Sequence, residues 1–479
     1  MNIRITIQYH TGWGESLTLR VGRRRFPMDP AYAGFWQVQL TGRNLKDGDK
    51  YSFEVEKDGK VLRREWRDHL FTAPEKADSL VIRSRWTDRP EDSTFYATAF
   101  SDVIFRRGDG ASFRAPRPAG PLKGNVTFRV PAPDVRSGES LAISGSGPLG
   151  DWQEFHLLDD GAFPYWRIDL DIRGVFEYKF VIADTRTKEI LMWEEGPNHF
   201  FAELPPKGSK LVIADLEPRF PTTPWRGAGV AVPVFSLKTQ DSFGVGDFHD
   251  IKKMVDWAEK AGQNVIQLLP INDTTMTHTW QDSYPYNAVS SFALHPMYIH
   301  LPEAGVRRDA AYKAKQAQLE ALPAVDYEAV TSAKLEYLRK LFRSAKGQAM
   351  AVSAEYKAFV DKNQDWLGPY AVFSVLRDEF GTPDFSTWGE FATYHTHKVD
   401  AFAAAHVDEV NFYLWEQYLL DAQLREAVAY AHRKGVALKG DLPIGVSRQS
   451  VDAWRHPELF HMDSQAGAPP DAFAVDGQN

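Results

Sequence analysis

Cysteine is absent from the 479 residues, so the chain can form no disulfide and carries no thiol nucleophile. Zinc or iron–sulfur sites that need cysteine ligands are excluded for the same reason. No apolar run approaches the ~20 residues that span a bilayer. The first residues, MNIRITIQYHTGWGESLTLRV, alternate apolar and polar positions and differ from a secretion signal. These absences predict a cytoplasmic protein with no membrane partner.

Dense positive charge is also scarce. The formal net charge is −8, and the only compact basic run is Arg23–Arg25. A nucleic-acid partner requires a basic surface, so we expect none. The histidine-containing stretches HTH (395–397) and HPELFH (456–461) have no carboxylate at metal-ligand spacing, and we therefore predict no metal site.

Aromatic residues, by contrast, are abundant. The chain has 14 Trp, 18 Tyr and 30 Phe, and together they make up 13% of the residues. Large flat apolar faces with a polar edge suit sugar rings, which have an apolar CH face and a rim of hydroxyl groups. Aromatic-rich β cores would give the same composition, so both interpretations stand at this level.

Two β-sandwich domains are predicted for the first half of the chain, at residues 1–105 and 124–215. Both segments consist of short alternating runs broken by Gly, Pro and Asp. Residues 106–123 are rich in Gly, Pro and Arg without a period, which predicts a linker.

The two predicted β domains also resemble each other. Tyr51 of YSFEV and Tyr178 of YKFVI lie 127 positions apart, and Trp66 and Trp193 have the same separation. Two independent features at one spacing indicate a duplicated module.

Residues 216–479 follow the pattern of an α/β domain. Apolar strand-like runs lie at 230–235, 264–270 and 436–445. Between the first two, DIKKMVDWAEKAG places apolar residues on one helical face, and a mostly helical insertion is expected at about 305–435. Alternating strands and helices predict parallel βα units.

Three motifs of the second β domain, LGDWQEF, FEYKFVI and MWEEGPN, together resemble the starch-binding module of carbohydrate-binding family 20. The resemblance implies that Trp152 and Trp193 form a stacking platform for two adjacent glucose units. It further implies that Lys179, Glu194 and Asn198 bind hydroxyl groups at the rim. Two rigidly held indoles can stack on an α-glucan at low entropic cost. The alternative is that both tryptophans are core residues.

The first β domain resembles the same family less closely. Trp66 lies in the region that matches Trp193 and is a candidate starch-binding residue, but Ser52 stands where the second domain has Lys179. No LGDW-like stretch is present. Trp13 either supplies a second aromatic face or packs against the domain.

Five motifs of the third region resemble the amylomaltase family, the 4-α-glucanotransferases of glycoside hydrolase family 77. They are SFGVGDF, QLLPIND, DSYPYNAVSSFALHPMYI, GDLPIGV and PPDAFAVDGQ. With two starch-binding modules ahead of this region, the chain is similar to the plant-type form of the family. The resemblance implies a (β/α)8 barrel and cofactor-free transfer of α-1,4-glucan segments to a sugar 4-hydroxyl. Its partners would be maltooligosaccharides, starch, glycogen or heteroglycan.

The resemblance also implies substrate-binding residues. Ligand groups of such barrels lie at the carboxyl ends of strands. Asp441 would bind donor-sugar hydroxyls, or else cap the next loop. Ser283 and Tyr286 would lie along the glucan cleft, although SYPY replaces the shorter SPY of some members, so either Tyr284 or Tyr286 could stack. His295 would contact substrate or serve as a structural histidine.

PPDAF resembles a mobile loop that covers the acceptor side, with Asp471, Phe473 and Gln478 near the sugars. Such a lid excludes water and favours transfer over hydrolysis.

Retaining transfer needs a nucleophilic carboxylate and an acid/base carboxyl about 5–5.5 Å away. The resemblance places both in later motifs that this sequence lacks, so we assign no catalytic residue and expect a fragment of a longer enzyme. The alternatives are a non-catalytic glucan-binding protein and, less favoured by the motifs, a hydrolase.

Overall fold

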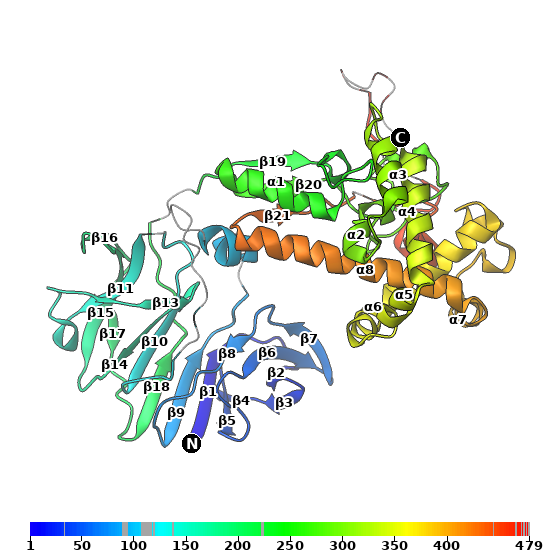
Figure 1. The fold of residues 1–479 in the computed structure, drawn as a ribbon. Coiled ribbons are helices and arrows are strands. Elements are labelled where there is room, and N and C mark those ends of the chain that lie inside the picture. The colour runs from blue at the N-terminus through cyan, green and yellow to red at the C-terminus, as the bar shows by residue number, and fades with distance from the viewer. Residues whose placement is uncertain are drawn as a thin grey trace. The chain divides into compact units, whose positions relative to one another are not determined.

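The computed structural model describes the chain except for residues 33, 89–93, 107–116, 118–119, 137, 222–224, 444, 465–466, 471, 473–474, 476 and 478–479. Two compact units are present, Met1–Arg226 and Gly227–Asn479 (Figure 1). No helix in the described part of the chain has the length and apolar character needed to cross a membrane.

The first unit consists of two β-sandwiches. The first sandwich contains β1 (Asn2–Gln8), β2 (Glu15–Val21), β3 (Arg24–Pro27), β4 (Asp29–Tyr32), β5 (Phe35–Thr41), β6 (Lys50–Lys57), β7 (Lys60–Arg64), β8 (His69–Leu70) and β9 (Ser79–Ser84). The second contains β10 (Val126–Pro131), β11 (Glu139–Gly145), β12 (His156–Leu157), β13 (Asp159–Ala162), β14 (Tyr165–Leu170), β15 (Phe176–Asp184), β16 (Ile190–Trp193), β17 (His199–Phe201) and β18 (Ser209–Ile213).

Alternation of apolar and polar residues explains the strands. In β1, the side chains of Ile3, Ile5 and Ile7 are buried, while the residues between them face outward. In β6, Tyr51, Phe53 and Val55 face the same core. Each sandwich therefore buries one face of a small sheet, with strand order β3-β2-β6-β7 in the first and β12-β11-β15-β16 in the second.

The two sandwiches share one long sheet. Its eight strands lie in the order β13-β14-β10-β18-β9-β1-β5-β4. At its centre β18 pairs in parallel with β9, from Ser209 opposite Ser79 to Ile213 opposite Arg83. The last strands of the two sandwiches are thus joined by backbone hydrogen bonds, which the prediction of two domains on a linker did not include.

Side chains reinforce this junction, which we call the seam. The hydroxyls of Ser79 and Ser209 lie 2.7 Å apart, and Arg83 forms an ion pair of 2.7 Å with Asp215. Val212, from β18, is buried in the hydrophobic core of the first sandwich, together with Ile82 of β9. The core of the first sandwich therefore includes a side chain from the second.

The segment before the predicted linker is helical rather than extended. Phe100 packs against Phe105 and, edge-on, against Trp225. Short 3-10 and π turns lie at Thr94–Tyr96, Ala99–Val103 and Ile104–Arg106.

The second unit contains a parallel three-stranded sheet and many helices. Its strands are β19 (Gly229–Val232), β20 (Val265–Leu268) and β21 (Ala437–Lys439), in that order in the sheet. The helices are α1 (Phe248–Lys260), α2 (Leu301–Ala304), α3 (Ala310–Glu320), α4 (Tyr327–Phe342), α5 (Ala345–Met350), α6 (Ala354–Phe380), α7 (Thr396–Ala405), α8 (Val407–Arg433) and α9 (Val451–Arg455). The three strands and the helical insertion lie where the sequence predicts them, although the strands are shorter.

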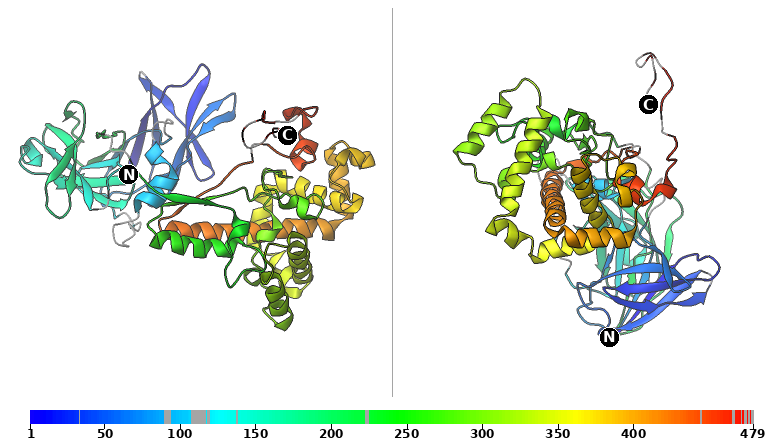
Figure 2. Two further views of the ribbon diagram at one scale, coloured as in Figure 1. Left: turned by 90° about the horizontal axis from the view of Figure 1, so that it is seen from above. Right: turned by 90° about the vertical axis from the view of Figure 1, so that its right-hand side faces the viewer.

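Helix α1 begins at a capping box. The carboxylate of Asp247 accepts from the first turn, and Asp250 bonds back to the backbone of Asp247. Helix α8 lies along α1 (Figure 2), and ion pairs join Lys252 to Glu426 and Glu259 to Lys434.

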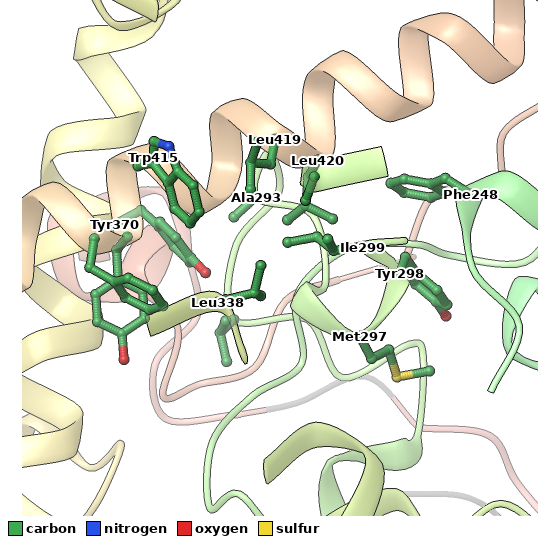
Figure 3. Packing of buried hydrophobic residues seen from close by; sticks show 14 of the residues in the cluster. Phe248, Ala293, Met297, Tyr298, Ile299, Leu338, Tyr370, Trp415, Leu419 and Leu420 are labelled. Carbon is green, nitrogen blue, oxygen red and sulfur yellow. The ribbon is translucent and has the colours of Figure 1, made fainter. Parts of the chain in front are cut away.

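The hydrophobic core of this unit lies on one side of α8. Trp415, Leu419 and Leu420 project from α8 toward Ala293 and Ile299 of the loop segment that follows β20 (Figure 3). The insertion is therefore part of one core with the sheet.

Candidate functional site

Tyr286 and Asp441 meet at the carboxyl ends of two neighbouring strands. Asp441 follows β21, and Tyr286 lies in the long loop after β20. The hydroxyl of Tyr286 donates to Oδ2 of Asp441 at 2.9 Å. This hydrogen bond raises the pKa of Tyr286 above its ordinary value. Parallel strands bring their carboxyl ends to the same edge, so two predicted substrate-binding residues come together here.

The two tyrosines of the SYPY stretch differ in their surroundings. Their ring centroids lie 5.6 Å apart at an interplanar angle of 47°. Tyr284 is 61% exposed, whereas the hydroxyl of Tyr286 is held by Asp441. Tyr284 therefore offers a free ring face, while Tyr286 is fixed in place.

Ser283 lines a separate hollow of about 430 Å³. It lies at the end of the 3-10 turn Trp280–Ser283, and the indole of Trp280 is 67% exposed at the same hollow. The carboxylate of Glu328 accepts from the backbone N–H of Trp280 at 3.1 Å. The sequence analysis did not single out Trp280, although a tryptophan directly before the DSYPY motif was a usable signal.

The helical insertion holds the loop after β20. Tyr370, from α6, donates to Asp273 at 2.8 Å, and Arg377 donates to the carbonyl of Thr275 at 2.8 Å. His278 bonds to Asp378 at 2.9 Å. Burial alone would raise the pKa of Asp378, but the charge of Arg377 and the bond from His278 outweigh it and hold the pKa well below its usual range.

Glu416 lies near these groups, in the middle of α8, and is fully buried. Neither of its carboxylate oxygens has a hydrogen-bond partner among the described residues. Burial, with a further contribution from the charge of Asp273, raises the pKa of Glu416 to about 8. At neutral pH this side chain therefore carries its proton.

His295 is buried, and its hydrogen bonds are made within the protein. Its Nδ1 accepts from the backbone N–H of Met297 at 3.1 Å, and its Nε2 bonds to the hydroxyl of Tyr327. Burial lowers its pKa, so the imidazole is neutral. Because the ring is almost wholly buried and both of its nitrogens are hydrogen-bonded within the protein, the geometry favours the structural alternative over the expected substrate contact. Asp471, Phe473 and Gln478 lie outside the described residues.

Trp152 and Trp193 come together on the second sandwich. Their ring centroids are 6.1 Å apart, with planes inclined at 43°. Trp193 ends β16 and is 41% exposed, and Trp152 lies in the loop between β11 and β12. The backbone of Trp152 adopts φ of 66°, an uncommon conformation for a tryptophan, and its N–H donates to Gly145 at 2.8 Å. A strained loop thus presents this indole beside Trp193, away from the core.

The predicted rim residues divide into two groups. Lys179 donates to the carbonyls of Glu194 and Gly196, and Asn198 donates to the carboxylate of Glu177 at 2.9 Å. Lys179 is partly exposed on β15, two residues before Val181, which pairs with Trp193, and Asn198 is exposed five residues beyond Trp193. Glu177 is an additional exposed carboxylate that the sequence analysis missed.

Glu194 does not reach the rim. Its side chain is buried, and its carboxylate lies 2.7 Å from Nε2 of His199. The first sandwich repeats this arrangement, with Glu65 at 3.1 Å from His69. The first sandwich has the same buried pair but no indole platform. We therefore infer that Glu194 stabilises the sandwich and does not bind sugar hydroxyls directly.

The register of the strands shows which residues correspond in the two sandwiches. The strands YSFEV and YKFVI match, so Glu54 corresponds to Val181. Glu54 pairs with Arg64 on β7, and Val181 pairs with Trp193 on β16. Arg64 therefore takes the place of Trp193, and Trp66 lies two residues further on, 85% exposed. Trp66 and Trp193 are therefore not structurally equivalent, although they lie 127 positions apart like Tyr51 and Tyr178. The duplication was predicted partly from this spacing, and that part of the prediction was wrong.

The first sandwich also lacks the loop that carries Trp152. Its β2 and β3 are joined by a tight hairpin, whereas β11 and β12 are joined by ten residues. Trp13, the other aromatic candidate, is 97% exposed in the loop between β1 and β2. Among the described residues no aromatic ring contacts Trp13 or Trp66, so neither belongs to a paired platform.

Comparison with known proteins agrees with this geometry. Residues 232–479, just over half of the chain, match the family described as 4-alpha-glucanotransferase. The chain belongs to the 4-alpha-glucanotransferase family. Residues 123–206 match the starch binding domain, which covers most of the second sandwich.

Individual members of the 4-alpha-glucanotransferase family extend the comparison. The rice (Oryza sativa subsp. japonica) protein "4-alpha-glucanotransferase DPE2" is 36% identical over 99% of this chain and 53% of its own length. The 4-alpha-glucanotransferase of Chlamydia caviae is 36% identical over 52% of this chain and 47% of its own length. The amylomaltase of Streptococcus agalactiae, solved with acarbose, is 25% identical over 53% of this chain and 52% of its own, with a TM-score of 0.45. The chain spans about half the length of these relatives.

No three His, Asp or Glu side chains in the described ranges converge as they would around a metal ion.

Proposed function

We propose that this protein is a 4-α-glucanotransferase, which transfers α-1,4-glucan segments to the 4-hydroxyl of an acceptor sugar. The observation that carries the proposal is the contact between Tyr286 and Asp441 at the carboxyl edge of β20 and β21, within the residues that match the family. A carboxylate held there by a phenol accepts hydrogen bonds from sugar hydroxyls, and the exposed ring of Tyr284 offers an apolar face beside it.

We further propose that β19, β20 and β21 are consecutive strands of a (β/α)8 barrel. Their parallel order and the position of Asp441 after β21 support this, because ligand groups of such barrels follow the strands. Ser283, at the neighbouring hollow, would bind a further part of the glucan, with Trp280 as its stacking surface. The mobile-loop role of Asp471, Phe473 and Gln478 rests on motif resemblance.

The mechanism proposed is double displacement. A glycosyl-enzyme forms on a carboxylate nucleophile and is released to the acceptor sugar, assisted by a second carboxyl group. Asp441 is not assigned either role, because its bond to Tyr286 suits a group that orients hydroxyls. The chemistry requires no cofactor.

The second sandwich would hold the polymer. Trp152 and Trp193 present two indoles. Lys179 and Asn198, whose donors are held by neighbouring oxygens of the same domain, would bind hydroxyl groups of the glucan. Rigid strands hold Trp193 and Lys179, so little conformational entropy is lost when glucan binds. We propose domain limits at 1–105, 124–215 and 216–479, with the first sandwich as a second, divergent module of the same kind.

The test is disproportionation of maltotriose by the purified protein in the longest form that its gene encodes. Product chromatography should show both shorter and longer maltooligosaccharides. Glucose and maltose without longer products would identify a hydrolase instead. Binding of glycogen with no change in maltotriose would favour the second candidate function, a non-catalytic glucan-binding protein, which the indole pair by itself also supports.

A further inference from the structure

The first sandwich carries guanidinium groups where the second carries its indole pair. We call this surface the arginine face; it consists of Arg20, Arg25, Arg64 and Glu54. Arg20 on β2 and Glu54 on β6 point outward, because their neighbours along each strand point into the core. Arg25 pairs with Arg20 and Arg64 pairs with Glu54, so all four lie on the outward side of the small sheet. Arg64 stands at the position of Trp193, and Arg25 follows the hairpin that replaces the Trp152 loop.

One buried carboxylate lies at the centre of the arginine face. Glu54 is 3% exposed and is surrounded by Arg20 at 3.4 Å, Arg25 at 3.0 Å and Arg64 at 3.5 Å. Arg25 also contacts Glu56 at 2.6 Å. The arginines lie close together because the buried charge of Glu54 must be paired.

The three arginines carry more positive charge and more N–H donors than Glu54 and Glu56 can balance. Each guanidinium has five N–H donors, so the three arginines offer more donors than the oxygens of Glu54 and Glu56 can accept. The side chains of Arg25 and Arg64 are 41% and 44% exposed, so their remaining donors face solvent. Arg23, in the adjoining hairpin, adds a further exposed cation.

An exposed aromatic ring accompanies these donors. Trp66 lies two residues beyond Arg64, and its backbone N–H is fixed by Asp88 at 2.9 Å. A guanidinium fork matches two oxygens of a phosphate or carboxylate, and an indole matches the CH face of a sugar ring. Arg64 stands at the strand position of Trp193, and Trp66 follows it two residues later, so both kinds of group belong to the segment that corresponds to the platform of the second sandwich.

We propose that the arginine face binds a carbohydrate that carries oxyanions, either phosphate monoesters or carboxylates. The arginines recognise the anion and Trp66 contacts the sugar ring. Nucleic acid is a poorer fit, because the face has few cations, contains the carboxylate of Glu54 and adjoins that of Glu56. A sugar ligand is favoured because the face corresponds in position to the indole platform of the second sandwich. The proposal concerns the first sandwich and does not depend on transferase activity.

The experiment uses the full chain with W152A and W193A, so that binding by the platform is removed. Affinity electrophoresis compares phosphorylated amylopectin, the same amylopectin after dephosphorylation, polygalacturonate and single-stranded RNA. The second unit can still bind neutral glucan, so the dephosphorylated polymer gives the baseline. We expect at least one anionic polysaccharide to bind more tightly than this baseline, and this excess binding to be lost at high salt. Phosphorylated amylopectin and polygalacturonate separate a phosphate ligand from a carboxylate ligand.

Substitutions then locate the site. R25Q with R64Q should weaken anionic binding about tenfold, the effect of a lost charged hydrogen bond. K76Q with K207Q removes two exposed cations elsewhere in the unit and should leave binding unchanged. R25K with R64K preserves the charge near Glu54 and therefore the fold, but loses the bidentate geometry and should weaken binding in part.

Three results would overturn the proposal. The first is equal binding of phosphorylated and dephosphorylated amylopectin together with no binding of polygalacturonate. The second is a loss of binding in K76Q/K207Q as large as that in R25Q/R64Q, and the third is tighter binding of RNA than of either anionic polysaccharide.

Discussion

The phenol of Tyr286 links two motifs that are 155 positions apart in sequence. Its hydrogen bond occupies one oxygen of Asp441, and the other oxygen has no partner among the described residues. A hydroxyl of a bound sugar can therefore donate to Asp441 without displacing Tyr286. The two tyrosines therefore have different expected roles. Tyr284 has an exposed ring, whereas the hydroxyl of Tyr286 orients a carboxylate.

Replacement of Tyr286 by phenylalanine tests this separation. Y286F should weaken maltotriose binding by roughly fivefold, or about 1 kcal/mol, because Asp441 loses the hydrogen bond that orients its carboxylate for a sugar hydroxyl. Isothermal titration calorimetry on the W152A/W193A background restricts the measurement to the second unit. Y284F, which keeps the ring face, is the matched control and should bind normally. The opposite pattern would contradict the role assigned to Tyr286.

Removal of either platform indole tests the polymer site. W152A and W193A should each weaken glycogen binding by about tenfold or more, since each loses apolar area together with a stacking contact. Affinity electrophoresis in glycogen-containing gels measures the change. Y32A removes an exposed ring from the first sandwich and is the control. Normal binding by both tryptophan variants would assign glycogen recognition to another surface.

At the scale of elements, patterns of apolar residues predicted more than motifs of polar residues did. Helix α1, the helical insertion and the three parallel strands follow directly from periodicity. The seam has no such signal in the sequence. The residues of β18 and β9 would show the same apolar pattern if the two strands were unpaired edges of separate sheets. Pairing between strands 130 positions apart depends on which edges meet in space, which local sequence does not encode.

Individual side chains show the same limit. Glu194 and His295 belong to recognisable motifs, yet both point inward, because a motif records residue identity and not the direction of a side chain. Trp66 matched Trp193 in spacing, but a different hairpin length moved it two residues out of register. Trp152 and Trp193 could be predicted, since their motifs include the strand and loop that fix them.

The buried carboxyl of α8 makes the second unit sensitive to pH. An unfolded glutamate titrates near 4.3, whereas folding raises the pKa of Glu416 to about 8. Between these values the folded chain holds a proton that the unfolded chain has lost. The free energy of unfolding contributed by this group should therefore fall as pH rises from about 4.3 to about 8.

Thermal unfolding of the second unit from pH 5 to pH 9 measures this effect. E416Q should flatten the decline toward high pH, because the amide cannot ionise. E336Q, at an exposed ion pair on α4, is the control and should follow the parent chain. A parent whose melting temperature rises across this range, with E416Q unchanged relative to it, would contradict a protonated Glu416.

For the molecule as a whole, the seam predicts that the two sandwiches behave as one folding unit. A long sheet crosses the boundary, and Val212 of one sandwich completes the core of the other. Elements that share backbone hydrogen bonds and a core lose both together, which favours a single cooperative transition.

V212D tests cooperativity across the seam. A carboxylate without a partner in the core of the first sandwich should cost several kcal/mol, and the whole unit should melt earlier in one transition. Differential scanning calorimetry resolves whether one or two transitions move. V175D introduces the same charge at a position 58% exposed on the second sandwich and should have little effect. Separate melting of the two sandwiches would mean that the seam does not couple them.

The parallel pairing of β18 with β9 also bears on how such proteins can evolve. A module attached by a flexible connector can be lost, copied or exchanged in one recombination event. Here, removal of the first sandwich would strip β18 of its neighbour β9 and leave β18 as an unpaired edge strand of the remaining sheet, a template for aggregation. The first sandwich therefore has a structural role that does not depend on its surface residues, because its strand β9 covers the edge of the second sandwich.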